Sequence, residues 1–467
     1  MAQSPAPRTA RRSLVLLVLA LVFFALFLVV TQSKLFAPTT TAPELAPELP
    51  LSGRWFPAPP PMDDATKEQL ESIGYAQGYE SAPGTSGVIR HDAAQTCPGL
   101  NLVFSGHGPE VLLMDAKGKP LHTWSLHYED VWSVPLIPDD RNLTFGETLS
   151  AQPDIDPVIT AKLPKYFLDS INLGHSYFRR AYLYPNGDLL TFFSYLGMVK
   201  LDKDSKVLWS RQMMAHHDLD VTADGRIYTI GLEPRAVPGL GDNGMLLDDY
   251  VAVLTADGTV ERKISILDAF LKSPFAVMVN AVPQELDLLH TNTVTILDDR
   301  LAARIPAFKA GNLLISCRNI STIAVLDPES GAIVWATTGP WKWQHEPSVL
   351  DNGHLLLLDN KGNNGYSRVL ELDPVTLEIA WEYSGTPPES FSTLELGSAA
   401  RLPSGNTLIT ESYKGHAFEV TADKNIVWDF LNPKRAGEHN ELIAAVYEVV
   451  RVPKNVAAAW LSPESTQ

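Results

Sequence analysis

Polar side chains that could bind an anion and move protons are concentrated between residues 285 and 368. They stand at the edges of short apolar runs of strand character, such as LLIS and HLLLLD. The set comprises His290, Asn292, Arg318, Asn319, His345, Asp359, Asn360 and Arg368. Arginine presents a planar fork of donors that suits sulfate or phosphate. Neutral histidine acts as a base or nucleophile, and protonated histidine acts as an acid. These residue types predict a site that holds an oxyanion and transfers a group.

Composition limits the classes of protein to consider. The chain has 467 residues, of which 45% are hydrophobic and 19% charged, which suffices for one large domain or two. A formal net charge of -17 argues against a nucleic-acid partner, which requires a basic surface. Two cysteines, Cys97 and Cys317, do not make a disulfide framework. Cys317 lies in an apolar run, where we expect a free buried thiol.

The N-terminal region has the pattern of a membrane anchor. Seventeen consecutive apolar residues, Leu14 to Val30, follow Arg8, Arg11 and Arg12. At about 1.5 Å per residue, this length just spans a hydrocarbon core. The preceding arginines predict a cytoplasmic N-terminus and an exported remainder. A cleaved signal peptide is the alternative, but its apolar region is usually shorter, and Leu35-Phe36-Ala37 is a poor cleavage site.

These signals predict a single-pass protein of the inner (cytoplasmic) membrane with its bulk on the periplasmic or extracellular side. Residues 1–12 would be cytoplasmic and residues 13–31 would form the anchor. Residues 32–98 are expected to form a proline-rich linker and an irregular lead-in.

From residue 99 the chain repeats a pattern of a glycine turn, two apolar strands and a second turn that leads to a tryptophan. A repeat of about 40–50 residues with four strands is typical of a propeller blade. Five units are recognisable, and a sixth could combine Leu102 to Trp124 with Ala445 to Val452. Such pairing of the two chain ends would close the ring without exposed edges.

The fold class predicted is therefore all-β, a six-bladed β-propeller over residues 99–454. It would contain little helix, an insertion over residues 126–173 and a C-terminal tail over residues 455–467. We expect the recurring tryptophans to pack between blades rather than bind a ligand. They are Trp124, Trp209, Trp335, Trp381 and Trp428.

Three histidines stand at a similar phase of three blades. His217 and His345 each precede a turn glycine by eight residues, and His290 precedes its glycine by more because residues 298–308 look inserted. Equivalent positions at the starts of inner strands face the central channel, so these side chains should meet at one mouth of the ring. A single histidine is more often structural, but three in phase, with Arg318 and Asn292 nearby, favour a functional site.

Other residues of the set have plausible structural roles. His216 adjoins His217 and would point the other way in a strand, so one of the pair is expected to be structural. Arg368 could pair with an acidic residue of the next strand, and Asp359-Asn360 could shape a turn. His175, His354 and His416 have weaker phase arguments and are interpreted as structural.

Taken together, these motifs resemble the arylsulfotransferase family of bacterial envelopes over roughly Gly99 to Val452. The matching pieces are His216-His217-Asp218, His290-Thr291-Asn292, Ser316-Cys317-Arg318-Asn319, Gln344-His345 and Asp359-Asn360 with Ser367-Arg368. The resemblance implies a six-bladed propeller that moves a sulfuryl group from a phenolic sulfate to a phenol. It implies a ping-pong reaction through a sulfohistidine, with no nucleotide sulfate donor, no cofactor and no metal. The expected partners are small phenolic sulfates and phenols, together with the membrane through the N-terminal helix.

The resemblance also implies roles for individual residues. His345, after Gln344, would be the nucleophile, and His290, Asn292 and Arg318 would hold the sulfuryl oxygens. His217 or His216 would lie beside the phenolic oxygen. Asn319, Asp359, Asn360 and Arg368 would complete the substrate-binding set. Cys317 stands where the family often has serine, and a membrane anchor departs from a soluble secreted enzyme.

Three alternatives remain at this point. The run from Leu326 to Trp335 looks like a quinoprotein repeat, but the chain has no adjacent cysteine pair and the histidines would be unexplained. A non-catalytic, membrane-anchored propeller could act as a scaffold. The histidines could also bind a metal together with Asp359.

Overall fold

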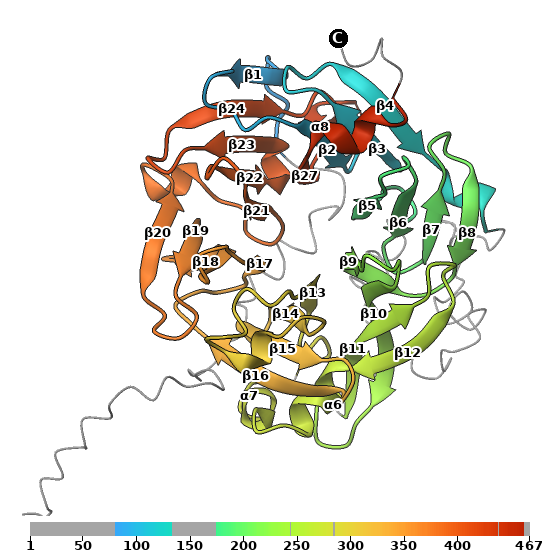
Figure 1. Cartoon of the computed structure of the whole chain (residues 1–467), viewed down its shortest axis with the longest axis vertical. Helices are drawn as coiled ribbons and strands as arrows, with labels where there is room; N and C mark the ends of the chain where they lie inside the picture. The colour runs from blue at the N-terminus through green and yellow to red at the C-terminus, as the bar shows by residue number, and fades with distance from the viewer. Residues whose placement is uncertain (1–79, 133–173, 243, 284, 438, 462–467) are drawn as a thin grey trace, which may run out of the picture. The chain divides into compact units, whose positions relative to one another are not determined.

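Six antiparallel sheets stand around one axis and form a six-bladed β-propeller, as predicted (Figure 1). The computed structural model describes residues 80–132, 174–242, 244–283, 285–437 and 439–461. In each blade one strand lies nearest the axis; these inner strands are β27, β5, β9, β13, β17 and β21 (Figure 1).

Each of the first three blades has four strands, which follow one another from the axis outward. The first blade contains β27 (Val446–Val452), β2 (Leu100–Ser105), β3 (Glu110–Met114) and β4 (Pro120–Ser125). The second contains β5 (Ala181–Leu183), β6 (Leu189–Phe193), β7 (Gly197–Leu201) and β8 (Val207–Arg211). The third contains β9 (Ala215–Val221), β10 (Ile227–Ala236), β11 (Met245–Leu254) and β12 (Val260–Ser265).

The remaining three blades follow the same order. The fourth contains β13 (Thr291–Ile296), β14 (Leu313–Cys317), β15 (Thr322–Asp327) and β16 (Ala332–Thr338). The fifth contains β17 (His345–Val349), β18 (Leu355–Asn363), β19 (Tyr366–Leu372) and β20 (Ile379–Ser384). The sixth contains β21 (Ser398–Arg401), β22 (Thr407–Glu411), β23 (His416–Val420), β24 (Ile426–Leu431) and a fifth strand, β1 (Gly87–His91).

The ring closes where the two ends of the propeller pair. β2 and β27 run antiparallel, with Asn101 opposite Arg451 and Phe104 opposite Glu448, which confirms the predicted sixth blade. β1 was not predicted, because it falls in the segment expected to be irregular. Its side chains are all at least partly exposed, so its sequence lacks the apolar alternation that marks a half-buried strand.

The recurring tryptophans join neighbouring blades, as predicted. In four blades the indole Nε1–H donates to a turn carbonyl of the next blade: Trp124 to Gly187 (3.0 Å), Trp209 to Ala256 (3.1 Å), Trp381 to Ala422 (2.9 Å) and Trp428 to Ala116 (2.8 Å). The third blade has no tryptophan at this place, and Arg262 of β12 donates to Pro328 O in its stead. Trp335 of the fourth blade is fully buried; it packs against Phe308 in a hydrophobic cluster that also contains residues of the fifth blade.

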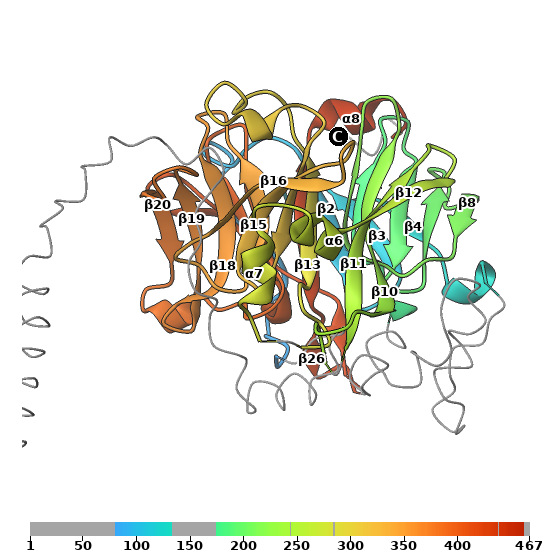
Figure 2. The same cartoon turned by 90° about the horizontal axis from the view of Figure 1, so that it is seen from below.

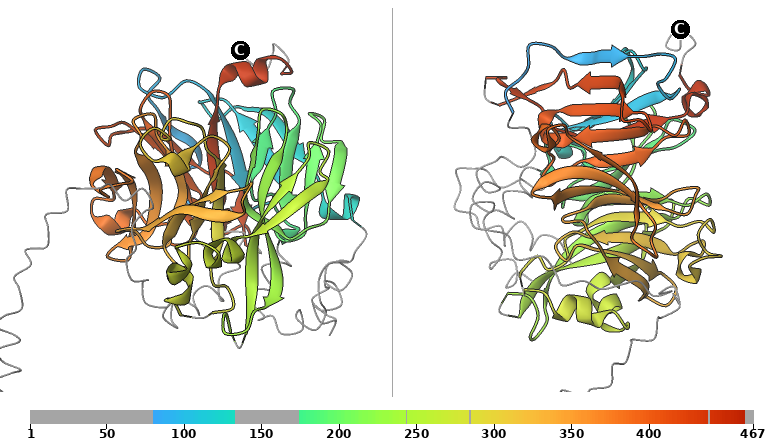
Figure 3. Two further views of the ribbon diagram at one scale, coloured as in Figure 1. Left: turned by 60° about the horizontal axis from the view of Figure 1, so that its bottom comes forward. Right: turned by 90° about the vertical axis from the view of Figure 1, so that its left-hand side faces the viewer.

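Helix is scarce in the described part of the chain, as predicted. The helices are α6 (Ile266–Leu271), α7 (Ala276–Asn280), α8 (Lys454–Ala458) and the 3₁₀ turns η1 (Tyr128–Asp130), η2 (Pro306–Phe308), η3 (Pro388–Ser390) and η4 (Ser412–Lys414). A small hairpin joins β25 (Arg435–Ala436) and β26 (Leu442–Ile443) just before β27. Figures 2 and 3 show α8 at one end of the ring, and Figure 2 shows β26 at the other.

Some predictions fall outside the described residues. They are the cytoplasmic segment, the anchor over 13–31, the linker up to residue 79 and most of the insertion, over 133–173. Within the ranges that the structure does describe, no helix is long and apolar enough to cross a membrane.

Candidate active site

The inner strands of the third, fourth and fifth blades begin with irregular backbone. The pairing register shifts beside His216 in β9, Thr291 in β13 and His345 in β17, which marks a β-bulge at each start. His217, His290 and Glu346 have left-handed φ angles of 59°, 47° and 49°. Such conformations are unfavourable for residues other than glycine and are often found at functional sites.

In the third blade, the histidine at the position equivalent to His345 lies one residue earlier than predicted. The last paired residue before the bulge is His216 opposite Ile230 in β9, and His345 opposite Leu358 in β17. The position that matches His345 is therefore His216 and not His217. The two bulged residues of β9 lie opposite no residue of β10, whereas those of β17 lie opposite one residue of β18. Counting back eight residues from each turn glycine therefore reaches His217 and His345, which are not equivalent positions. The rings still converge, with centroids 4.8 Å apart between His217 and His290.

His345 is buried, with 2% of its surface exposed, and its hydrogen bonds fix its tautomer. Its Nδ1 lies 3.0 Å from Trp343 O and 2.8 Å from Asn360 Oδ1. The Asn360 amide donates to Thr393 O and Leu396 O, so its oxygen faces the imidazole. Both partners of Nδ1 are acceptors, and Nδ1 therefore carries the hydrogen. The lone pair is left on Nε2, which is buried and has no hydrogen-bond partner among the described residues.

The surroundings keep His345 neutral. Burial, followed by the positive charge of Arg318, lowers the pKa of His345 to about 3, although the hydrogen bond to Asn360 acts in the opposite direction. The imidazole is therefore uncharged throughout the physiological range, with a nucleophilic Nε2.

His290 is bound in a similar way to a carboxylate. Its Nδ1 contacts Asp287 Oδ2, which only accepts, so Nδ1 again carries the hydrogen. Its Nε2 is a second buried nitrogen without a partner in the described part of the chain. Burial and Arg318 lower the pKa of His290, and Asp287 opposes that shift. Asn319 braces this pair by donating to Asp287 O at 2.6 Å.

Arg318 and Asn292 both lie in this cluster. The Arg318 guanidinium is 4.9 Å from the Trp343 ring centroid, and its Nε donates to Asn319 Oδ1 at 3.1 Å. Stacking and hydrogen bonding thus hold the cation beside the histidines. Asn292 donates to Gln344 O at 2.9 Å, so it supports the backbone immediately before His345.

Gln344 turns its amide away from His345 and toward the fourth blade. Its amide nitrogen donates to Ser316 Oγ, Cys317 O and Thr322 O of the fourth blade.

Cys317 is a free buried thiol, as predicted, and burial raises its pKa to about 12. A thiol in that state is not a nucleophile.

Asp359 and Arg368 pair with each other. Asp359 accepts hydrogen bonds from the backbone amides of Lys342 and Gly362, and Arg368 Nε donates to its other oxygen at 2.8 Å. Arg368 also pairs with Glu382. These partners are those of the structural interpretation, and substrate binding by either residue stays a prediction. Across the described ranges, no group of three or more His, Cys, Asp or Glu side chains is arranged to hold a metal ion.

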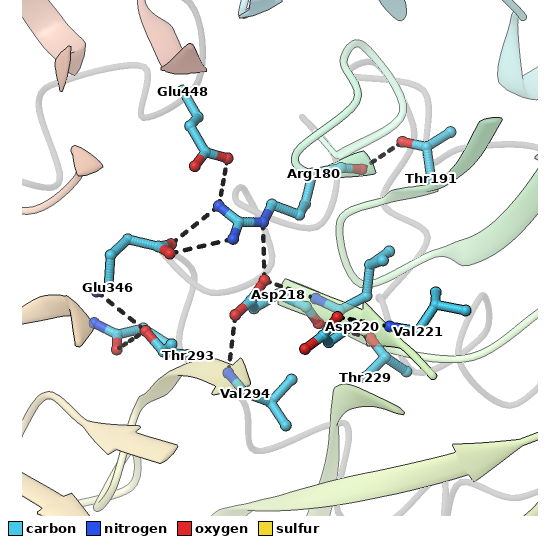
Figure 4. Close-up of polar contacts among 12 residues, drawn as sticks. Arg180, Thr191, Asp218, Asp220, Val221, Thr229, Thr293, Val294, Glu346 and Glu448 are labelled. Atoms are coloured by element: carbon cyan, nitrogen blue, oxygen red, sulfur yellow. Dashed lines mark hydrogen bonds and ion pairs between the residues drawn. The ribbon is translucent and has the colours of Figure 1, made fainter. Parts of the chain in front are cut away.

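An ion cluster centred on the partly buried Arg180 joins four blades (Figure 4). Two of its carboxylates adjoin the histidines in the sequence, because Asp218 follows His217 and Glu346 follows His345. Arg180 directly precedes β5. Its guanidinium contacts Asp218 of β9 (2.8 Å), Glu346 of β17 (3.1 Å) and Glu448 of β27. Asp218 also accepts from Val294 N of β13 at 2.9 Å. Burial raises the pKa of Asp218 well above its usual range and that of Glu448 to about 7, and the charge of Arg180 opposes both shifts.

Sequence reasoning missed Arg179 and Arg180. The Arg179 guanidinium lies 5.0 Å from the Tyr447 ring centroid, and its charge contributes to the lowered pKa of His345 and His217. Two consecutive arginines before an inner strand, in a chain of net charge -17, were the available signal.

Comparisons with known proteins identify the family. The sequence model described as "Arylsulfotransferase (ASST)" matches residues 180–433. A comparison with curated proteins gave no significant match. Among solved structures, a protein of unknown function from Bacteroides caccae is 12% identical, with a TM-score of 0.43, over 76% of this chain and 99% of that one. A streptogramin B lyase structure is 13% identical, with a TM-score of 0.40, over 81% and 100%. Since the family model spans more than half of the sequence, the chain belongs to the arylsulfotransferase family.

Proposed function

We propose that this protein transfers a sulfuryl group from a phenolic sulfate to a phenolic acceptor in two steps, through a sulfated His345. No nucleotide sulfate donor would take part. The observation that carries the proposal is the Nε2 atom of His345, a buried lone pair without a partner among the described residues, next to fixed positive charge. Leaving a buried polar atom unsatisfied costs about 1–3 kcal/mol, so the unpaired Nε2 calls for an explanation, and a role as nucleophile supplies one.

In the first half-reaction, His345 Nε2 attacks the sulfur and the bond from sulfur to the aryl oxygen breaks. The phenol leaves, and the sulfuryl group is bonded to Nε2. In the second half-reaction an acceptor phenol attacks the same sulfur and frees Nε2. Hydrogen on Nδ1 suits this exchange, because Trp343 O and Asn360 Oδ1 stabilise the positive ring during attack.

Charge on the sulfuryl oxygens grows at the transition state, as it does in phosphoryl transfer. Arg318 would bind these oxygens, and Arg179 adds a second positive charge nearby. His290 would hold the group through its Nε2 once that atom carries a proton, which Asp287 stabilises. His217 would serve the phenolic oxygen.

The segment over residues 13–31 would anchor the protein in the inner membrane with the propeller exported, where phenolic sulfates from outside could reach it. Membrane fractionation with protease protection tests this placement. Recovery of a soluble fragment that begins after residue 37 would instead support a cleaved signal peptide.

The reaction sequence can be tested by a single-turnover experiment. Full-length protein mixed with a chromogenic aryl sulfate and no acceptor should release one phenol per protein and then stop. Addition of a phenol should restart turnover. Release of phenol at a constant rate without acceptor would show hydrolysis, and no release from several aryl sulfates would contradict the proposed function.

A further inference from the structure

His216 and His217 form a direct contact between their rings. Their Nδ1 atoms are 2.6 Å apart, so one carries a hydrogen and the other a lone pair. On the other side of His216, Nε2 lies 3.3 Å from Asp249 Oδ1. Asp249 is 1% exposed, and its second oxygen accepts from the backbone amide of Thr291. Three titratable groups therefore stand in series.

The direction of the hydrogens follows from the carboxylate. Among the described residues, His216 Nε2 and Asp249 Oδ1 make no hydrogen bond, but they lie 3.3 Å apart, and the negative charge of Asp249 favours a hydrogen on His216 Nε2. A neutral His216 then has its lone pair on Nδ1 and accepts from His217 Nδ1–H. This leaves the lone pair of His217 on Nε2, the atom farthest from Asp249 in the series.

We propose that Asp249, His216 and His217 form a proton relay that serves the phenolic oxygen, an inference that rests on the proposed sulfuryl transfer. When the acceptor attacks, its O–H bond breaks and the proton binds His217 Nε2. The hydrogen on His217 Nδ1 passes to His216 Nδ1, and the positive charge comes to rest on His216 beside Asp249. The donor half-reaction starts from the protonated relay that the preceding acceptor half-reaction leaves. His217 Nε2–H protonates the departing phenolate, the hydrogen on His216 Nδ1 returns to His217 Nδ1, and the relay is neutral again.

The surroundings explain why a single imidazole would not suffice. Burial, and then the positive or protonatable neighbours His290, His216, Arg179 and His345, lower the pKa of His217 well below its usual range. Moving the charge to His216 places it against a carboxylate in a site of low dielectric, where attraction is strong. Tyr195 stacks on the His216 ring with centroids 5.3 Å apart and keeps it in line. His216 and Asp249 are therefore positioning residues that act through His217.

A leaving-group comparison tests the relay in the full-length protein. His216→Asn and Asp249→Asn are assayed with phenyl sulfate and with nitrophenyl sulfate, whose phenolate leaves without protonation. We expect a loss of about 10²-fold or more with phenyl sulfate and only a several-fold loss with nitrophenyl sulfate. The double variant should be no worse than either single variant, because the groups act in series.

His416→Asn is the matched control, since His416 also contacts carboxylates, Glu411 and Asp429, in another blade. It should alter both donors equally. If Asp249→Asn loses the fold through its contact with Thr291, His216→Asn alone gives the same comparison. Equal losses on both donors in folded variants would overturn the relay while leaving the transfer intact. No transfer by the unaltered protein from either donor would overturn the proposed function and the relay together.

Discussion

His345 and His416 are histidines in two adjacent blades whose surroundings have opposite effects. His416 contacts a carboxylate at each nitrogen, Glu411 at 2.6 Å and Asp429 at 2.8 Å, and stacks on Phe418. Burial alone would lower its pKa, but the two carboxylates raise it to about 9. His345 is held at Nδ1 only, and its pKa falls to about 3.

Structural and reactive polar groups differ in whether their hydrogen-bonding atoms are paired within the fold. His416 and the Arg180 cluster satisfy their charges within the fold, whereas the histidine cluster of the third to fifth blades leaves Nε2 of both His290 and His345 unpaired among the described residues. Residue type alone would not distinguish His345 from His416; their hydrogen-bond partners do. Replacing an internally paired residue such as His416 or Arg180 should reduce stability, whereas replacing His290 or His345 should reduce activity.

The largest expected effect is that of His345→Asn. Transfer should fall by at least ~10³-fold, since one residue carries the group in both half-reactions. Asparagine can keep a donor toward Trp343 O, so the fold should persist. Initial rates and thermal unfolding measured on one preparation check both statements. A folded variant that keeps a tenth of the activity would remove His345 from its role.

Arg180→Met should mainly affect stability. It leaves the buried Asp218 and Glu448, together with the partly exposed Glu346, without their cation, and breaking a buried ion pair costs about 3–5 kcal/mol. Urea unfolding measures the loss. Glu448→Gln removes one carboxylate but keeps the cation paired, and it should cost clearly less; equal losses would mean that the cluster does not act as a unit.

Arg318→Lys keeps the charge and loses the planar fork. Turnover should fall by about 10²-fold, as for a lost transition-state donor, with little change in stability. Arg451→Lys is the control, because Arg451 is also buried and pairs with Glu419 at 3.0 Å in the blades that close the ring. The control should unfold more easily but turn over within a few-fold of the unaltered protein. An unchanged rate in Arg318→Lys would exclude Arg318 from sulfuryl binding.

The smallest effects concern stability against pH. The pKa of His345 is lowered on folding from its unfolded value of ~6.5 to about 3, so the unfolded chain binds more protons between these values. His345 therefore lowers the free energy of unfolding as pH falls from ~6.5 to about 3. The His345→Asn variant should lose less stability than the unaltered protein over the same pH range. His416 has a raised pKa, so its contribution is complete below pH ~6.5 and disappears as pH rises through about 9.

Urea unfolding at a series of pH values measures both. His416→Gln should be less stable than the unaltered protein at pH ~6 and should approach it above pH ~9. Curves that stay parallel across the whole range would show that neither histidine shifts on folding.

Most of the fold was predictable because its signals are local. A turn glycine and a following tryptophan mark each blade, and Trp124 and Trp428 bond to the next blade as their repetition indicated. Closure through β27 followed from the need to cover edges. β1 was not predictable, since it pairs with β24 through its backbone and has no apolar face.

The site was predictable in its residue types but not in its pairings. His290 and His345 both lie near the charge of Arg318, whereas Asp359 and Arg368, which are also polar residues at strand edges, pair with each other. Which carboxylate lies beside a histidine depends on bulges and rotamers, so Asp249 and Asp287 carried no sequence signal.

The central claim is that His345 Nε2 carries the sulfuryl group between donor and acceptor. The direct measurement is mass spectrometry with peptide mapping of full-length protein, trapped with an aryl sulfate and no acceptor at neutral to alkaline pH, where an N–S bond survives. We expect one SO₃ group per protein, on the peptide that contains His345, and its loss when a phenol is added. A label on His217 or His290 instead, or no label in protein that turns over, would contradict it.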